Sequence, residues 1–190
     1  MDAVDAIYGR RSIRDYAVAA PPREEIEALI EAAIQAPNGV NLQPWTFAVI
    51  CGRPILAEWS RLAKAHILGS GVALPGGLAD VLKDEAFDIF YNAPALVVIC
   101  ATNADPMSVK DCCLAAANLM LAAHDRGLGT CWIGFSEGWL ASTEGRARLG
   151  VPDGCVPVAP IILGRPVSLP PRPGRRPAEI RWIETAPAHA

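Results

Sequence analysis

The chain has 190 residues, a formal net charge of -3 and a hydrophobic fraction of 52%. Its length argues for one domain built around one sizeable core. Acidic and basic residues are mixed along the chain, which argues against nucleic acid or an anionic membrane as a partner. The high apolar fraction indicates that some surface is buried against a partner chain, so we expect an oligomer.

The six cysteines lie mostly inside apolar runs, without a CxxC pair or metal-ligand spacing. We therefore expect buried reduced thiols and no metal site. The N-terminus lacks a basic-then-apolar leader, and no apolar stretch is long enough to span a bilayer. These features predict a cytoplasmic protein.

A short helix predicted over residues 2–9 leads into the basic cluster "RRSIRD". Arg10, Arg11, Ser12 and Arg14 offer three guanidiniums and one hydroxyl, donors that can converge on one phosphate. A solvated basic turn would show the same pattern, so the cluster alone does not distinguish a phosphate site from such a turn.

A surface helix is predicted over residues 23–36 and a strand over 45–51. Between them, Asn38, Asn41 and Gln43 carry amides that suit a planar heterocycle, and Gly39 permits close backbone approach. The alternative is a helix stop followed by a turn whose Asn side chains bond their own backbone.

Another amphipathic helix is expected after residues 52–54, and the glycine-rich stretch 69–78 is expected to be a lid or a variable substrate wall. A buried strand over 95–101 precedes a helix over 108–126 that is apolar on most sides. We expect that helix at the centre of the molecule.

The stretch "GLGTCWIGF" surrounds a predicted strand over residues 130–133. A helix C-cap and a tight turn account for Gly127 and Gly129, whereas Gly134 lets backbone N–H groups face a ligand. A last strand over 156–163 precedes a proline-rich tail with Arg172, Arg175 and Arg176. A docked strand is predicted at residues 180–183, with a disordered tail as the alternative.

No nucleophile–histidine pair, metal-ligand set or nucleotide-binding loop is evident, so no catalytic side chain is predicted. The order of elements predicts an α+β fold.

Taken together, five stretches resemble the FMN-dependent nitroreductase family. They are "RRSIRDY", "APNGVNLQPWTFAVI", "FYNAPALVVI", "DCCLAAANLMLAAHDRGLGTCWIGF" and "ILGRP" with the later "RRP". The resemblance implies one nitroreductase-like domain over residues 1–190, with a central mixed or antiparallel sheet flanked by helices. It further implies an intertwined homodimer that exchanges an extended C-terminal arm, residues 166–190.

The resemblance also implies roles for single residues. Arg10, Ser12 and Arg175 correspond to ligands of the FMN phosphate, with Arg11 close by. Arg14 corresponds to a cation at the pyrimidine edge of the flavin, where it stabilises the negative charge of the reduced ring.

Two further segments carry implied flavin contacts. The backbone N–H groups near Ile133 and Gly134 correspond to those that face flavin N5 and O4. The other subunit contributes a loop that corresponds to Pro37, Asn38, Gly39 and Asn41. Residues 64–88 diverge from the family pattern and leave the substrate wall unassigned.

The implied function is an FMN-dependent NAD(P)H oxidoreductase working in two half-reactions. NADH or NADPH passes a hydride to flavin N5, and a small electron-poor acceptor, such as a nitroaromatic or a quinone, takes the electrons. The alternatives are a flavin-binding or storage protein without turnover, and a specialised reductive dehalogenase or oxidase. Neither the acceptor nor the choice between NADH and NADPH follows from the sequence.

Overall fold

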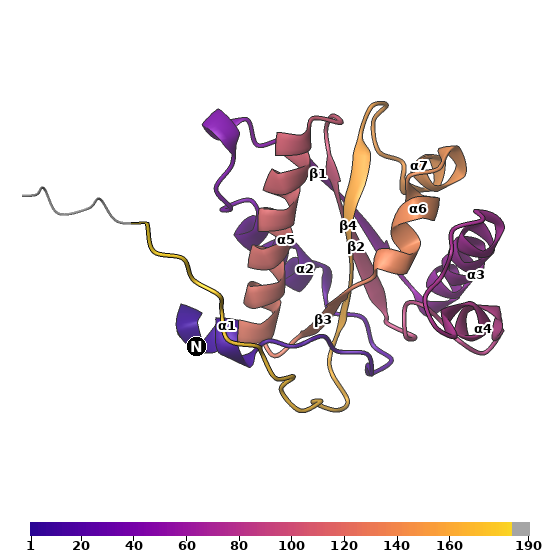
Figure 1. Ribbon diagram of the computed structural model, residues 1–190, viewed down its shortest axis with the longest axis horizontal. Helices are drawn as coiled ribbons and strands as arrows, with labels where there is room; N and C mark the ends of the chain where they lie inside the picture. Colours follow the sequence, from indigo (N-terminus) through magenta and orange to yellow (C-terminus); the bar gives the residue numbers. More distant parts are fainter. Residues whose placement is uncertain (184–190) are drawn as a thin grey trace, which may run out of the picture.

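The computed structural model describes residues 1–183, which contain one four-stranded antiparallel sheet in the order β1-β2-β4-β3 (Figure 1). The α+β fold expected from the sequence is confirmed, and every strand pair in this sheet is antiparallel. The strands are β1 (Trp45–Cys51), β2 (Ala95–Ala101), β3 (Gly129–Trp132) and β4 (Val156–Gly164).

Helices cover both faces of the sheet, because the two central strands are apolar on both sides. Every residue of β2 is buried, and β4 is buried from its second residue onward. The α-helices are α1 (Ala3–Gly9), α2 (Arg23–Ala33), α3 (Arg53–Gly69), α4 (Leu78–Lys83), α5 (Pro106–Asp125), α6 (Glu137–Leu140) and α7 (Thr143–Leu149). Two 3₁₀ turns, η1 (Gly39–Asn41) and η2 (Gly134–Ser136), complete the described elements.

Two separate hydrophobic cores result. The helices α2 and α5 pack on one face through residues such as Leu29 and Leu119. On the other face, α3 and α6 meet through Trp59 and Trp139, whose ring centroids lie 5.3 Å apart. Figure 1 shows α5 on one side of the sheet and α3, α4, α6 and α7 on the other.

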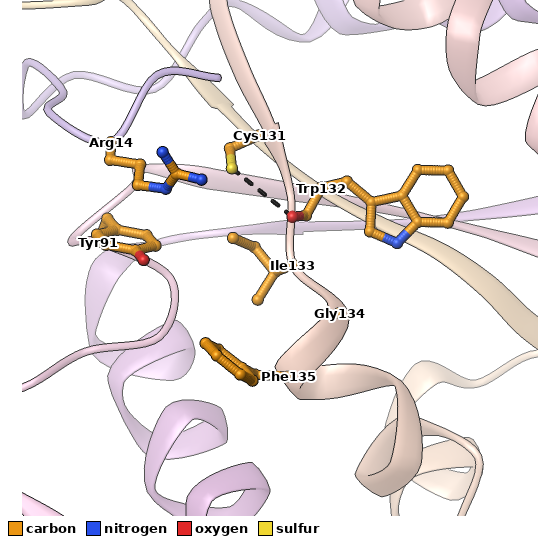
Figure 2. Close-up of a pocket in the computed structure, with 7 residues that line it drawn as sticks. All are labelled: Arg14, Tyr91, Cys131, Trp132, Ile133, Gly134 and Phe135. Atoms are coloured by element: carbon orange, nitrogen blue, oxygen red, sulfur yellow. Dashed lines mark hydrogen bonds between the residues drawn. The ribbon is translucent and has the colours of Figure 1, made fainter. Parts of the chain in front are cut away.

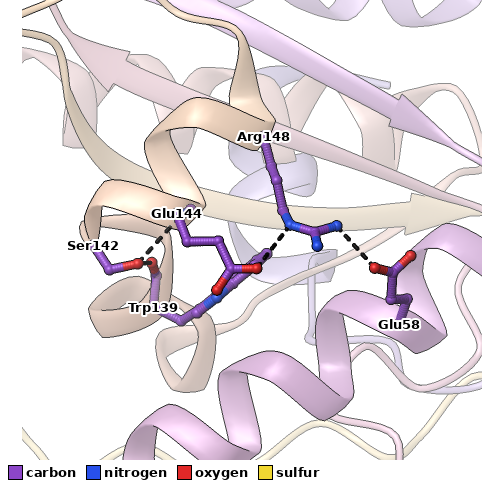
Figure 3. Close-up of polar contacts among 6 residues, drawn as sticks. Glu58, Trp139, Ser142, Glu144 and Arg148 are labelled. Carbon is purple, nitrogen blue, oxygen red and sulfur yellow. Dashed lines mark hydrogen bonds and ion pairs between the residues drawn. The ribbon is translucent and has the colours of Figure 1, made fainter.

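A polar contact joins α7 to α3 across the second core (Figure 3). Arg148 of α7 forms ion pairs with Glu144 in the same helix, at 3.1 Å, and with Glu58 of α3, at 2.8 Å. Ser142 accepts from the Gly145 N–H and caps the start of α7. The exposed ion pairs add little stability by themselves, so the apolar contacts set this packing.

The central helix differs in one respect from the expectation. α5 ends, as predicted, at a Gly127 in the left-handed conformation, with φ 71°. Its outer side is not covered within one chain, because Met107 is 50% and Leu114 is 44% exposed. The helix is therefore central only on the side that faces the sheet.

Two other expectations need correction. Cys51 and Cys113 are exposed, although the remaining four cysteines are buried as predicted. The predicted docked strand at residues 180–183 is wrong for a single chain, because Ile180, Trp182 and Ile183 are exposed and lie outside any strand. The last part of the predicted arm, residues 184–190, lies outside the described residues.

Within residues 1–183, no helix is long and apolar enough to cross a membrane.

The segment that follows α1 packs tightly on β3. A Cβ atom added to Gly129 would lie 2.7 Å from the Cβ and the Cγ1 of Ile13. Ile13 is only 3% exposed, so its side chain has no room to move away. Glycine at position 129 therefore permits this close approach.

We predict that Gly129→Ala lowers the free energy of unfolding by about 1–3 kcal/mol, the usual cost of overpacking a core. The control is Gly76→Ala, because a Cβ at Gly76 meets nothing within 4 Å. The control changes stability by less than about 1 kcal/mol. Urea denaturation of both variants measures the difference, and equal stabilities would contradict the proposed packing constraint.

Candidate functional site

Backbone contacts hold the basic segment against the edge of the sheet. Ser12 forms an isolated parallel bridge with Thr130, and the Ile13 N–H donates to the Thr130 carbonyl at 2.9 Å. The buried Tyr16 hydroxyl donates to the Ile13 carbonyl at 2.6 Å. Residues 10–14 are therefore fixed beside β3, close to the turn that follows it.

The predicted phosphate residues line one pocket, which we call the basic pocket. Its volume is about 410 Å³. It is lined by Arg10, Arg11, Ser12, Arg14, Pro170, Pro171, Pro173 and Arg175. Residues more than 150 positions apart in the sequence thus meet here, and no carboxylate is among them.

Arg11 plays a different part from its neighbours. Its Nε donates to the Gly9 carbonyl at 3.1 Å, and its Nη1 donates to the Pro170 carbonyl at 2.7 Å. These bonds tie the proline-rich tail to the basic segment. Arg11 therefore shapes the pocket through the tail.

The electrostatic effect of the cluster is visible at His124, near the end of α5. Its partial burial, together with the charges of Arg11 and Arg10, lowers the pKa of this imidazole below its ordinary value. A cationic environment disfavours a further positive charge and favours an anion.

A second pocket, which we call the strand-end pocket, lies at the end of β3 and measures about 290 Å³. Figure 2 shows Arg14 and Tyr91 on one side of it and the β3–η2 turn on the other. Its lining residues are Arg14, Tyr91, Cys131, Trp132, Ile133, Gly134 and Phe135. Arg14 lines both pockets, so the basic pocket and the largely apolar strand-end pocket adjoin at this side chain.

The turn after β3 offers one free backbone donor rather than two. The Ile133 N–H donates to the Pro160 carbonyl at 2.8 Å and so continues the sheet. Gly134 is exposed, and its N–H has no acceptor among residues 1–183. Of the two predicted backbone contacts, Gly134 is available to a ligand and the Ile133 N–H is not.

The remaining predicted residues, Pro37, Asn38, Gly39 and Asn41, lie elsewhere in the chain. The Gly39 N–H donates to Asp111 near the start of α5, whereas His124, at the other end, contacts Gly9. Asp111 and His124 are thirteen positions apart on α5, which is about 20 Å at 1.5 Å per residue. One chain therefore does not bring this loop to the basic pocket.

The loop also retains much of the local bonding that was the alternative interpretation. The Asn38 side chain accepts from the Gln43 N–H at 2.8 Å and donates to the Ala36 carbonyl at 3.3 Å. Asn41 has a left-handed backbone with φ 59° and is exposed. Both Asn side chains are thus engaged within their own loop, because Asn41 Oδ1 accepts from Gln43 Nε2 at 3.3 Å, although Asn41 stays exposed.

Sequence reasoning assigned no role to two features of the strand-end pocket. Tyr91 lies in the quoted stretch "FYNAP", but its ring faces Arg14 only because of the backbone turn around it. Trp132 donates from Nε1 to Glu137 at 2.6 Å, a contact across the β3–η2 turn. The spacing of five residues gives no recognisable signal for that contact.

Comparison with known proteins identifies the family of the chain. Residues 7–165 match the model of the nitroreductase family. The chain therefore belongs to the nitroreductase family, and the class of enzyme expected from the sequence, an oxidoreductase of this family, is confirmed.

Individual relatives add detail. A Methanothermobacter thermautotrophicus protein that carries the name NADH dehydrogenase/NAD(P)H nitroreductase is 31% identical, over 90% of this chain and 80% of its own. The crystal structure of a Bacteroides fragilis nitroreductase with bound FMN superposes with a TM-score of 0.84 at 26% identity, covering 97% of this chain and all of that one. An iodotyrosine deiodinase from Thermotoga neapolitana is 26% identical over 64% of this chain and 67% of its own.

Proposed function

We propose that this protein is an FMN-dependent NAD(P)H oxidoreductase that reduces electron-poor small molecules in two alternating half-reactions. The observation that carries the proposal is a basic pocket and a largely apolar pocket that adjoin at Arg14. This pair of pockets suits a cofactor with a phosphate at one end and a planar ring at the other. The similar B. fragilis structure holds FMN.

The residues of the basic pocket would bind the phosphate. Arg10 and Arg175 supply guanidinium groups, and Ser12 supplies a hydroxyl, a donor set that matches a phosphate's acceptors. The nearby Arg11 holds the tail segment that brings Arg175 to the pocket.

The strand-end pocket would hold the ring. When bound, FMN accepts a hydride from NADH or NADPH and delivers reducing equivalents to the acceptor. The Gly134 N–H would donate to the ring edge, and Arg14 would stabilise the negative charge of the reduced ring. No side chain of the chain itself needs to act as a nucleophile.

We further propose that the working unit is a homodimer with exchanged C-terminal arms and with a shared site. Exposed apolar side chains lie on α5 and on the two segments that contact it, α1 and η1. These side chains are Val4, Ile7, Tyr8, Val40, Leu42, Met107 and Leu114. Pairing two such surfaces would cover them and bring the partner's η1 loop towards the basic pocket.

Purified protein is expected to be yellow with bound FMN, and NADH or NADPH should bleach it under anaerobic conditions. Adding a nitroaromatic or a quinone then restores the absorbance of the oxidised flavin. A halotyrosine is the third acceptor to test, because a deiodinase is among the relatives. Protein that binds FMN but never bleaches would be a flavin store, and protein that binds no FMN would contradict the proposal.

Replacing Arg10 and Arg175 together by Ala should weaken FMN binding by about 2–4 kcal/mol, because each charge-assisted contact is worth about 1.5–3 kcal/mol before compensation. Titration of the apoprotein with FMN measures the loss. The matched control replaces Arg23 and Arg61, which are exposed and lie outside both pockets. Equal affinities of the two double variants would mean that the phosphate binds elsewhere.

Sedimentation equilibrium should give twice the chain mass of 20.2 kDa. Leu114→Asp places a charge in the apolar face of α5 and should yield a monomer that has lost FMN affinity. Val81→Asp is the control, since Val81 is 45% exposed, much like Leu114, but lies on α4 across the sheet. A monomeric wild-type protein that binds FMN fully would rule out the shared site.

A further inference from the structure

The turn that contains Tyr91 has a strained backbone. Tyr91 and Asn92 adopt left-handed conformations, with φ 54° and 52°. Asn tolerates this region, but a bulky aromatic residue seldom adopts it. Such strain persists only where the surrounding structure enforces it, and it concentrates at functional sites.

Side-chain and backbone hydrogen bonds enforce the turn. The Asp88 carboxylate accepts from the Phe90 N–H at 2.9 Å and from the Asn92 N–H at 2.8 Å. The Tyr91 N–H donates to the Asp88 carbonyl at 3.0 Å. One aspartate therefore fixes the backbone on both sides of Tyr91.

Two side chains of α3 bind the residues that lead into this turn. The amine of Lys64, which is 6% exposed, donates to the Asp84 carbonyl at 2.8 Å and to the Phe87 carbonyl at 2.7 Å. Ser60, 2% exposed, accepts from the Ile89 N–H at 3.0 Å. A buried lysine with two carbonyl acceptors makes this a rigid support rather than a free loop.

The anchored turn places the Tyr91 ring against Arg14. The guanidinium carbon lies 5.6 Å from the ring centroid, within the range of a cation–π contact. Phe87 makes an edge-to-face contact with the Tyr91 ring, with centroids 5.8 Å apart and planes at 84°. Figure 2 shows the Arg14 guanidinium beside this ring at the wall of the strand-end pocket.

Arg14 has no other directional contact within the described chain. Among residues 1–183 it forms no hydrogen bond and no ion pair, and its side chain is exposed. A long unpaired side chain samples many rotamers, so an aromatic surface is what restricts its direction.

We propose that Tyr91 is a positioning residue, whose ring, held by the strained turn, keeps the Arg14 guanidinium at the wall of the strand-end pocket where it stabilises the reduced ring of bound FMN. The inference rests on the proposed function. It predicts that loss of the aromatic ring shifts the preference of the site for reduced over oxidised FMN, without loss of the phosphate contacts.

The test is the two-electron midpoint potential of FMN in the full-length, FMN-loaded protein. Tyr91→Leu removes the aromatic face, and Tyr91→Asn removes it with a residue that suits the left-handed backbone and so keeps the fold. Each should reduce the preference for reduced over oxidised FMN about twofold to fivefold, a shift of up to about 20 mV to lower potential. Tyr91→Phe keeps the ring and should stay within about twofold of wild type.

A double-mutant cycle with Arg14→Gln shows whether Tyr91 acts through Arg14. Arg14→Gln alone should lower the potential, and adding Tyr91→Leu to it should cause no further change. Additive shifts, or unchanged potentials in both Tyr91→Leu and Tyr91→Asn, would overturn the inference and leave the proposed function intact. A wild-type protein that binds no FMN would instead overturn the proposed function.

Discussion

The close approach of residues 10–16 to β3 is the constraint on which the rest of the site depends. Gly129 lets Ile13 lie directly on the strand, and the Ser12–Thr130 bridge sets the register of the segment. Arg10 and Ser12 thereby line the basic pocket, and Arg14 reaches both this pocket and the turn after β3. Two segments more than 100 residues apart in sequence lie side by side because no side chain stands between them at position 129.

Much of the fold could be predicted from the sequence, because periodicity and turn residues reflect local physics. β1, β2, α5 and the Gly127 cap lie within a few residues of their predicted places. The prediction for residues 180–183 failed because apolar character indicates burial but does not say against what. The same limit applies to α5, whose apolar outer side is uncovered within one chain.

In the candidate site, too, the sequence predicts local features better than contacts between distant segments. Arg10, Arg11, Ser12 and Arg14 are adjacent in sequence, and their meeting with Arg175 followed only from the family resemblance. The contact between Tyr91 and Arg14 depends on two left-handed residues, and no spacing rule predicts a left-handed tyrosine. The hydrogen bond from Ile133 to Pro160 could not be predicted from the sequence either, because it depends on how far the pairing with β4 continues beyond the end of β3.

The bond from Arg11 to the Pro170 carbonyl has a kinetic consequence. Prolines 170, 171 and 173 line the basic pocket, so the tail borders any anion bound there. If the tail must move aside for that anion to leave, the anion leaves no faster than the tail moves, whatever its equilibrium affinity. The rate of that movement would then depend on the Arg11–Pro170 bond together with the stiffness of a proline-rich segment, which resists partial opening.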